Sequence, residues 1–216
     1  MDSKKLVCFA LLASMTSVSY ADGFFINTSL GASNYYSEYP LNPAFEVHHS
    51  HTEALRFGYR WATGPFSYGL ETGYANLGQG DQWQPGNFHW SQYRERIDGF
   101  MLGPSLRYSL PLGFYISAHA GAFRSTDHQT YKFTYSEPLI GGAYNNYYFS
   151  DRVNNSTTGT YVGVGVGYDV NKSLSLGVDY DTYRMHVMAN NAYFYTSTFM
   201  TSPRVDAYTV TAEYRF

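Results

Sequence analysis

The chain has 216 residues, of which 14 are Lys or Arg and 17 are Asp or Glu. Charged residues make up only 14% of the sequence and aromatic residues 19%, whereas a soluble domain carries about 25% charged residues. This balance argues against a nucleic-acid partner, which would normally require a clustered basic face. The scarcity of charge also argues against an ordinary soluble domain.

The first 21 residues have the pattern of a signal peptide. Lys4 and Lys5 provide a positive start, Leu6 to Ala13 form an apolar run, and Ser19-Tyr20-Ala21 places small residues where a signal peptidase cleaves. The alternative is a membrane-spanning helix, which requires roughly 20 apolar residues, and this run is much shorter. We therefore predict export, with cleavage after Ala21 and a mature domain over residues 22–216.

The only cysteine, Cys8, lies near the start of the apolar run, whereas a lipid-anchor cysteine follows the end of such a run. The mature chain is therefore expected to have no thiol, no disulfide and no thiolate metal site. Removal of the leader also removes two lysines and one aspartate, which leaves 12 basic and 16 acidic residues and a net charge of −4.

Eight segments of the mature chain alternate between apolar or aromatic residues and small or polar residues, the two-residue period of a β-strand. In the sixth segment, Val162, Val164 and Val166 alternate with glycines. Pro104 lies in the middle of the fourth segment, where it removes a ladder hydrogen bond, and we expect a bulge to accommodate it. The segments cover residues 24–36, 53–61, 66–77, 96–108, 114–125, 159–170, 174–184 and 205–216.

Short and long connections alternate between these segments. The short ones cover residues 62–65, 109–113 and 171–173, and the long ones cover 37–52, 79–95, 126–158 and 185–204. Outer-membrane barrels have tight periplasmic turns and long extracellular loops. The pattern predicts an all-β protein, an eight-stranded antiparallel up-and-down transmembrane β-barrel with both termini in the periplasm.

A soluble β-sandwich or a lipocalin-like barrel is the alternative architecture. Such folds bury the apolar side of each strand and expose the polar side. Eight strands enclose just enough room for side chains, so we expect the small and polar residues inside and the bulky ones outside, in lipid. A Lys or Arg on the lipid-facing band costs about 2–4 kcal/mol, and our assignment places no charged residue there.

The few charges of the barrel segments fall on the inward side and predict a lumenal charge network. Buried ions persist only when they are paired, so we expect Arg56 to pair with Glu71, and Asp179 to join His119 or Arg56. The network either plugs the barrel or forms an ion pathway, and the narrow lumen favours a plug. Its two layers are Arg56, Glu71, His119 and Asp179, and, nearer the short turns, Arg60, Arg107, Glu213 and Arg215.

Four arginines fall on the outward side, about ten to twelve residues above the short turns. Membrane-spanning strands have roughly 9–11 residues, so these side chains are expected just above the apolar band, where the phosphates of lipopolysaccharide lie. Arginine forks suit phosphate oxygens. The alternative is that they are ordinary interface anchors. The four are Arg96, Arg124, Arg184 and Arg204.

No catalytic, cofactor-binding or metal site is predicted. The cluster His48-His49-x-His51 has imidazoles that could hold Zn or Ni, but a loop with no companion carboxylates is usually only polar. Some outer-membrane barrels are enzymes that act on lipid A through a rim histidine. His128 with Ser125 and Asp127, or His186, could imitate such a site, but no pattern of those enzyme families is present.

Aromatic residues occur in two settings. Those near the short turns are expected to form the lower girdle of a membrane barrel. Those in the long loops either form an adaptable recognition surface for an extracellular ligand or belong to strands that continue above the membrane.

The stretch GVGVGYDVNKSLSLGVDYDTY, Gly163 to Tyr183, resembles the penultimate hairpin of the OmpA-like transmembrane β-barrel family, and AEYRF, Ala212 to Phe216, resembles its last strand. The resemblance implies that Tyr214 and Phe216 form the C-terminal signal that the barrel-assembly machinery recognises. It also implies that Asp179 and Glu71 are lumenal acids facing basic side chains. The peptidoglycan-binding C-terminal domain of OmpA itself is not expected, because the chain stops at the last strand.

Small barrels of this kind serve several functions, so the fold alone does not decide among them. We expect a non-enzymatic integral protein of the bacterial outer membrane, with a plugged polar lumen and a structural or surface-interaction role. The alternatives are a narrow porin-like channel and a lipid A-modifying enzyme. The expected partners are outer-membrane lipids, lipopolysaccharide, the barrel-assembly machinery and an extracellular ligand at the loops.

Overall fold

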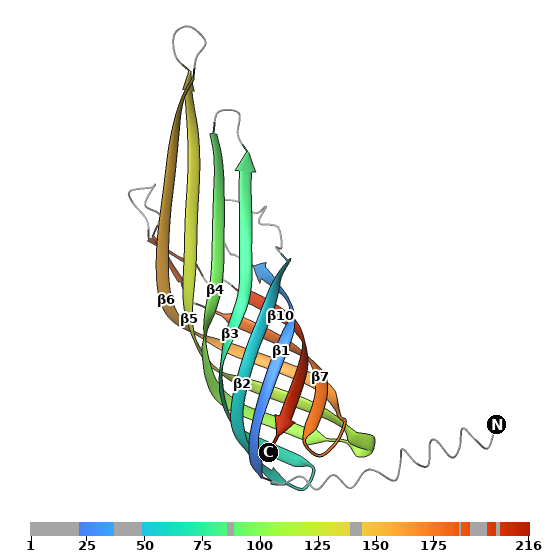
Figure 1. Ribbon diagram of the computed structural model, residues 1–216. Helices are drawn as coiled ribbons and strands as arrows, with labels where there is room; N and C mark the ends of the chain where they lie inside the picture. The colour runs from blue at the N-terminus through green and yellow to red at the C-terminus, as the bar shows by residue number, and fades with distance from the viewer. Residues whose placement is uncertain are drawn as a thin grey trace, which may run out of the picture.

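The computed structural model describes residues 22–36, 49–85, 89–138, 144–185, 187–190, 198–201 and 204–216 (Figure 1). The predicted signal peptide lies outside these residues. No described helix is long and apolar enough to cross a membrane. The elements are β1 (Gly23–Tyr36), β2 (His49–Thr63), β3 (Phe66–Pro85), β4 (His89–Ser109), the 3-10 helix η1 (Pro111–Gly113), β5 (Phe114–Pro138), β6 (Tyr144–Asp169), β7 (Leu174–Arg184), β8 (Val187–Asn190), β9 (Thr198–Thr201) and β10 (Arg204–Arg215).

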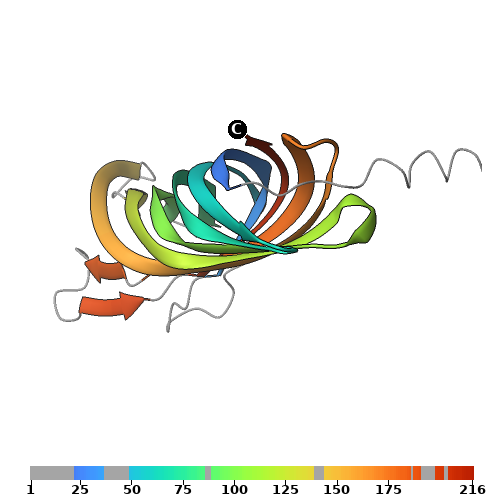
Figure 2. The ribbon, with the colours of Figure 1, turned by 90° about the horizontal axis from the view of Figure 1, so that it is seen from below.

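Eight of these strands close into an antiparallel barrel, in the order β1-β10-β7-β6-β5-β4-β3-β2. The first and last strands of the chain pair with each other, so the ring has no free edge where it closes. Figure 2 shows this ring, with the small hairpin of β8 and β9 beside β6. The predicted eight-stranded up-and-down barrel is confirmed.

The register of the strands shows how far they tilt. A path that follows paired residues once around the barrel leaves β6 at Val166 and returns to β6 at Ser156, ten residues away. Such a stagger requires strands tilted by roughly 40° to the barrel axis. Because a strand rises roughly 3.3 Å per residue, each residue then climbs about 2.5 Å along the axis.

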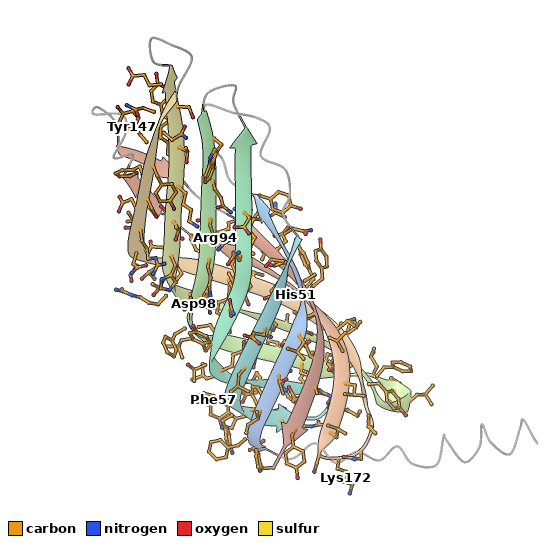
Figure 3. All side chains as sticks on the ribbon, turned by 45° about the horizontal axis from the view of Figure 1, so that its top comes forward. His51, Phe57, Arg94, Asp98, Tyr147 and Lys172 are labelled. Carbon is orange, nitrogen blue, oxygen red and sulfur yellow. The ribbon has the colours of Figure 1, made fainter. Side chains whose placement is uncertain are left out.

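The outer wall of the barrel is apolar. Phe57 stands on this wall (Figure 3) with 54% of its surface exposed. Val210 is 64% exposed. Next to the short turns, neighbouring aromatic rings lie in contact, such as Phe24 with Tyr59 at 5.0 Å between centroids and Phe114 with Tyr168 at 5.3 Å. A soluble barrel would bury these side chains, whereas lipid accommodates them. We call this end, with the connections 64–65, 110–113 and 170–173, the turn end.

Pro104 does not produce the bulge that we expected. It remains paired with Leu70 of β3. On the other side, pairing with β5 stops at Leu102–Ala122 and resumes at Ser105–His119 without a shift of register. The prediction of a bulge is therefore wrong. The ladder omits the bond that proline cannot donate and keeps its alignment.

Strands β3 to β6 are longer than predicted and rise beyond the rest of the ring as a sheet (Figure 1). The segments 79–95 and 126–158, expected as loops, are largely strands of this sheet, with residues 86–88 and 139–143 outside the description. A register shift at Asn76–Gln79, where Gly78 has φ +89°, marks where β3 leaves the barrel. Of the two interpretations of these segments, strands that continue above the barrel are confirmed for the described residues. The strand bounds were set too short because the outward residues there are polar instead of apolar.

Candidate functional site

A cluster of buried charges occupies the middle of the lumen. Arg56 of β2 reaches across the barrel to β7, where its Nη2 donates to Asp181 Oδ2 at 2.7 Å and its Nη1 to Asp179 Oδ2 at 3.5 Å. His119 of β5 shares a hydrogen bond of 2.5 Å between its Nε2 and Asp181 Oδ1. Each of these four side chains is buried, so the charges of Arg56 and the two aspartates are compensated by one another instead of by water. We call these residues and Glu71 the central cluster.

The expected Arg56–Glu71 pair is not formed. Both residues lie on the inner wall, but Arg56 is opposite Gly73 in the sheet, and Glu71 is opposite Gly58. Glu71 instead accepts a hydrogen bond of 3.2 Å from the Tyr161 hydroxyl. The prediction considered only neighbouring strands, whereas in so narrow a barrel an arginine spans the lumen and meets two carboxylates on the far wall.

Asp181 was missing from the predicted network although its position indicates it. It lies two residues after Asp179 on β7 and therefore faces the same side. The glycines opposite make room for both acids, because a Cβ added at Gly163 would lie 2.0 Å from Asp181 Oδ1 and one at Gly165 2.0 Å from Asp179 Oδ1. The alternation of glycine and valine in β6 thus reserves space for the acids of β7.

A second group of charges, the turn-end cluster, fills the lumen closer to the short turns. Glu213 of β10 accepts from Arg60 Nη1 at 2.7 Å and from Arg107 Nη1 at 3.1 Å. Asp169, which sequence reasoning missed, pairs with Arg107 and with Arg215 Nη2 at 2.8 Å. The guanidinium of Arg60 also lies over the ring of Phe25 at 3.9 Å. The four predicted residues of this layer are thus brought together, with one further acid.

Above the central cluster, away from the turn end, the lumen becomes apolar. Tyr161 stacks on Tyr183 with 6.1 Å between ring centroids, and Phe123 meets Tyr183 edge-on at 4.9 Å. The expectation that only small and polar residues point inward is wrong for this layer, because the bulky residues here pack on one another. The apolar layer consists of Tyr35, Ala75, Leu77, Ile97, Met101, Phe123, Tyr161, Tyr183, Met185, Val205 and Ala207.

Acidic residues lie on the inner face above this layer. Asp127 and Glu95 are both buried, and Gln129 donates a short hydrogen bond to Asp127. Burial raises the pKa of Asp127 to about 6, although the Gln129 hydrogen bond opposes the shift. Asp127 lies 13 residues after the start of β5, about 32 Å along the axis and beyond the roughly 25 Å apolar band.

The four outward arginines are exposed, as their parity predicts. Arg184 and Arg124 both lie ten residues from the turn end of their strands, and Arg204 lies eleven from Arg215. These intervals correspond to about 25 Å, the height of the apolar band. Arg96 lies 13 residues from Ser109 and therefore stands higher.

The histidines considered for other chemistry do not form the imagined sites. His128 points outward and contacts Asp98 through Nε2 at 3.3 Å and Asn154 through Nδ1 at 2.9 Å. Ser125 and Asp127 are buried on the opposite face of the same strand, so His128 cannot act with them. His51 is exposed, whereas His48, His186 and the side chain of His49 lie outside the described residues. No group of three potential metal ligands occurs in the described part of the chain.

The C-terminal residues Tyr214 and Phe216 lie on the outer wall at the turn end. Their exposed fractions are 49% and 72%, and their rings meet edge-on at 5.1 Å. The backbone N–H of Phe216 donates to Phe24 O at 3.1 Å, so the end of the chain is fixed to the first strand.

Several solved structures of outer-membrane proteins are similar to this chain. Among solved structures of similar fold is the outer membrane protease OmpT from Escherichia coli, with 10% identity, a TM-score of 0.52, and 93% of this chain and 100% of that chain covered. The attachment invasion locus protein Ail of Yersinia pestis has 11% identity, a TM-score of 0.49, and 91% and 100% covered. Neisserial surface protein A has 10% identity, a TM-score of 0.47, and the same coverage.

At such identities the likeness to OmpT shows the fold and carries nothing about its protease activity. A search of curated proteins finds no match. The sequence does match the family described as outer membrane protein beta-barrel domain, over residues 6–216. The predicted resemblance to small OmpA-like barrels fits this result. With nearly its whole length matched, the chain belongs to the outer membrane protein beta-barrel family.

Proposed function

We propose that this protein is a non-enzymatic, non-conducting barrel of the bacterial outer membrane. In this proposal the turn end and both termini face the periplasm, and the sheet of β3 to β6 stands outside the cell. The protein then serves the envelope as a closed structural element that carries an interaction surface.

The filled lumen carries the proposal. The turn-end cluster, the central cluster and the apolar layer follow one another along the axis, and together they engage side chains from all eight barrel strands. The cavity lined by Arg56, Glu71 and Glu213 has a volume of about 20 Å³, room for about one water molecule. An ion that crossed would have to displace paired charges and then pass an apolar layer.

Conductance of the purified protein in planar bilayers tests this closure. We expect no unitary conductance from the wild type, and small openings from a Tyr161→Ala, Tyr183→Ala variant, in which the ring stack of the apolar layer is removed. Openings from the variant would also show that the barrel inserts into the bilayer, so this variant is the insertion control. Ohmic steps from the wild type would overturn the proposal in favour of a narrow channel.

The orientation is supported by the difference between the two ends. The described connections at the turn end are tight, and the strands that extend beyond the ring do so at the opposite end, as in barrels whose extracellular side is larger. A tag at Asn145-Asn146 should be labelled on intact cells, and one at Asn171-Lys172 only after the outer membrane is opened. Labelling in the reverse pattern would invert the topology.

Surface interaction is supported by aromatic side chains that the tall sheet leaves exposed. Tyr135 of β5 is paired with Tyr147 of β6 on one face, with 42% and 53% of their surfaces exposed (Figure 3). Exposed tyrosines on a rigid scaffold suit recognition of a partner. Replacing both by Ser should reduce adhesion of expressing cells to a host-cell layer, whereas Tyr148→Ser, on the opposite face with 63% exposed, should not. Unchanged adhesion in the double variant would remove this part of the proposal.

The remaining alternative is a lipid A-modifying enzyme. Lipid A mass spectra from cells with and without the gene should be identical under the proposal. A mass difference that returns with the wild-type gene would replace the structural role by an enzymatic one.

A further inference from the structure

Two outward arginines stand on either side of β6, with two threonines of β6 between them. Arg184 of β7 is paired with Thr160, and Arg124 of β5 is paired with Thr158. All four side chains are exposed on the same outer face. Arg124 Nη1 already donates to Thr158 Oγ1 at 3.4 Å. Two guanidinium forks and two hydroxyls therefore surround one patch of the wall.

The height of this patch is that of the outer edge of the membrane. Arg124 and Arg184 both lie ten residues from the turn end of their strands, about 25 Å along the axis, which equals the apolar band. Directly below on β6, Val162, Val164 and Val166 are each more than half exposed. A ligand over the patch therefore lies next to lipid chains.

Among the described residues, the two arginines have no acidic partner, unlike similar arginines of this wall. Arg204, directly opposite Arg184 in the sheet, is neutralised by Asp206, with 2.8 Å between Nε and Oδ1. Arg94, higher on the same wall, pairs with Asp81 at 2.7 Å. Within the described ranges, no carboxylate pairs with Arg124 or Arg184. Two uncompensated cations near each other favour an anion between them.

We infer that Arg124, Thr158, Thr160 and Arg184 form a phosphate-binding site for lipopolysaccharide of the surrounding leaflet. Arginine forks donate two parallel hydrogen bonds to phosphate oxygens, and the threonine hydroxyls add further donors. The anion is carried on a lipid, because the site opens sideways over an apolar wall. The phosphates of lipid A are carried on its glucosamine disaccharide, to which the acyl chains are attached, and therefore lie at this level. In the cell the inference relies on the proposed orientation, which places this rim in the outer leaflet.

The test uses the full-length protein, refolded in detergent micelles, and measures binding of bisphosphorylated and of dephosphorylated lipid A. The Arg124→Gln, Arg184→Gln variant should bind the bisphosphorylated form about tenfold or more weakly than the wild type. Arg94→Gln is the control, because that exposed arginine stands higher on the same wall and is already paired with Asp81, and it should bind as the wild type does. Dephosphorylated lipid A should bind all three proteins equally weakly.

Equal affinity of the wild type and the double variant for bisphosphorylated lipid A would overturn the inference and leave ordinary interface anchors. Equal binding of the two lipid forms by the wild type would overturn it as well. Retained heat-modifiable migration in gels shows that each variant is folded. The micelle measurement does not depend on orientation in the cell, so its failure is distinguishable from a failure of the topology, which surface labelling reports.

Discussion

The same strands run through the barrel and through the tall sheet above it, yet their side-chain polarity reverses at the rim between the two. On β5, Ile116 in the barrel points outward and His119 inward, whereas at the rim Arg124 points outward and Phe123 inward. The strand geometry does not change across this boundary, but the surroundings do. The outer face passes from lipid to water, and the inner face passes from ion pairs to apolar packing. Side-chain polarity along one strand thus records where the membrane ends.

The two regions should differ most in how much an ion pair contributes to the free energy of unfolding. Arg56→Ala should lower the free energy of unfolding by about 3–5 kcal/mol, because it leaves the carboxylates of the central cluster buried without their cation. Arg94→Ala should lower it by no more than about 1 kcal/mol, because the Arg94–Asp81 pair is nearly half exposed (Figure 3). Urea unfolding in lipid vesicles measures both. Equal losses would show that the lumen screens charge as water does.

The Arg56–Asp181 pair of the central cluster should also show energetic coupling. In a double-mutant cycle, Arg56→Ala and Asp181→Ala should cost less together than the sum of the single changes, because the pair is lost only once. Additive losses would show that the 2.7 Å contact contributes nothing to stability.

A charge introduced at two heights on one face of β6 should have two different effects. Val164→Lys should destabilise the protein by about 2–4 kcal/mol, because the side chain faces lipid. Ser150→Lys, exposed on the same face of the tall sheet, should change the stability by no more than about 0.5 kcal/mol. Unfolding in vesicles again measures the two variants. A large loss at Ser150 would place the upper sheet inside the membrane.

The smallest expected effect concerns pH and is local to the upper sheet. Because burial raises the pKa of Asp127 from its usual 3.8 to about 6, the folded form holds this proton more tightly than the unfolded form. The contribution of Asp127 to the stability of the upper sheet is therefore complete below about pH 4 and is lost as the pH rises toward 6. A shift of this size corresponds to no more than about 3 kcal/mol.

Hydrogen exchange of β4 and β5 amides checks this dependence. Protection of the upper sheet should fall between pH 4 and 6, after correction for intrinsic exchange, while amides next to the turn end stay unchanged. In Asp127→Asn the fall should disappear, because the amide carries no titrating proton. A fall that persists in this variant would assign the titration to another group.

The barrel could be predicted from sequence because its strands alternate strictly and its connections differ in length. Both signals are local, and both come from lipid on the outside and a narrow space within. The upper parts of β3 to β6 were expected as loops because their outward residues, such as Thr130 and Ser150, are polar. Aromatic and polar residues still alternate from Tyr131 to Tyr135, but the polar ones are on the side that was apolar in the barrel, so the segment no longer has the pattern of a lipid-facing strand.

The lumenal residues could be predicted one by one, but not their partners. Parity placed Arg56, Glu71 and Asp179 inside, and the structure has them there. The choice of Asp181 over Glu71 as the partner of Arg56 depends on how far an arginine reaches across a closed ring. The width that the arginine must cross follows from the stagger of ten residues. The stagger is a property of the complete register and cannot be read from any single strand.

The lumenal ion pairs have one further consequence, for the rates of folding and unfolding. Arg56 joins β2 to β7, Arg60 joins β2 to β10, and Arg107 joins β4 to both β6 and β10. In each case the two strands are not neighbours in the ring. The pairs that join β2 to β7 and to β10 cannot form while the sheet is open between β1 and β10, so they appear only after the first and last strands have met. Interactions absent from the transition state slow unfolding and leave the rate of folding unchanged. These ion pairs would then set the lifetime of the closed barrel by slowing its unfolding.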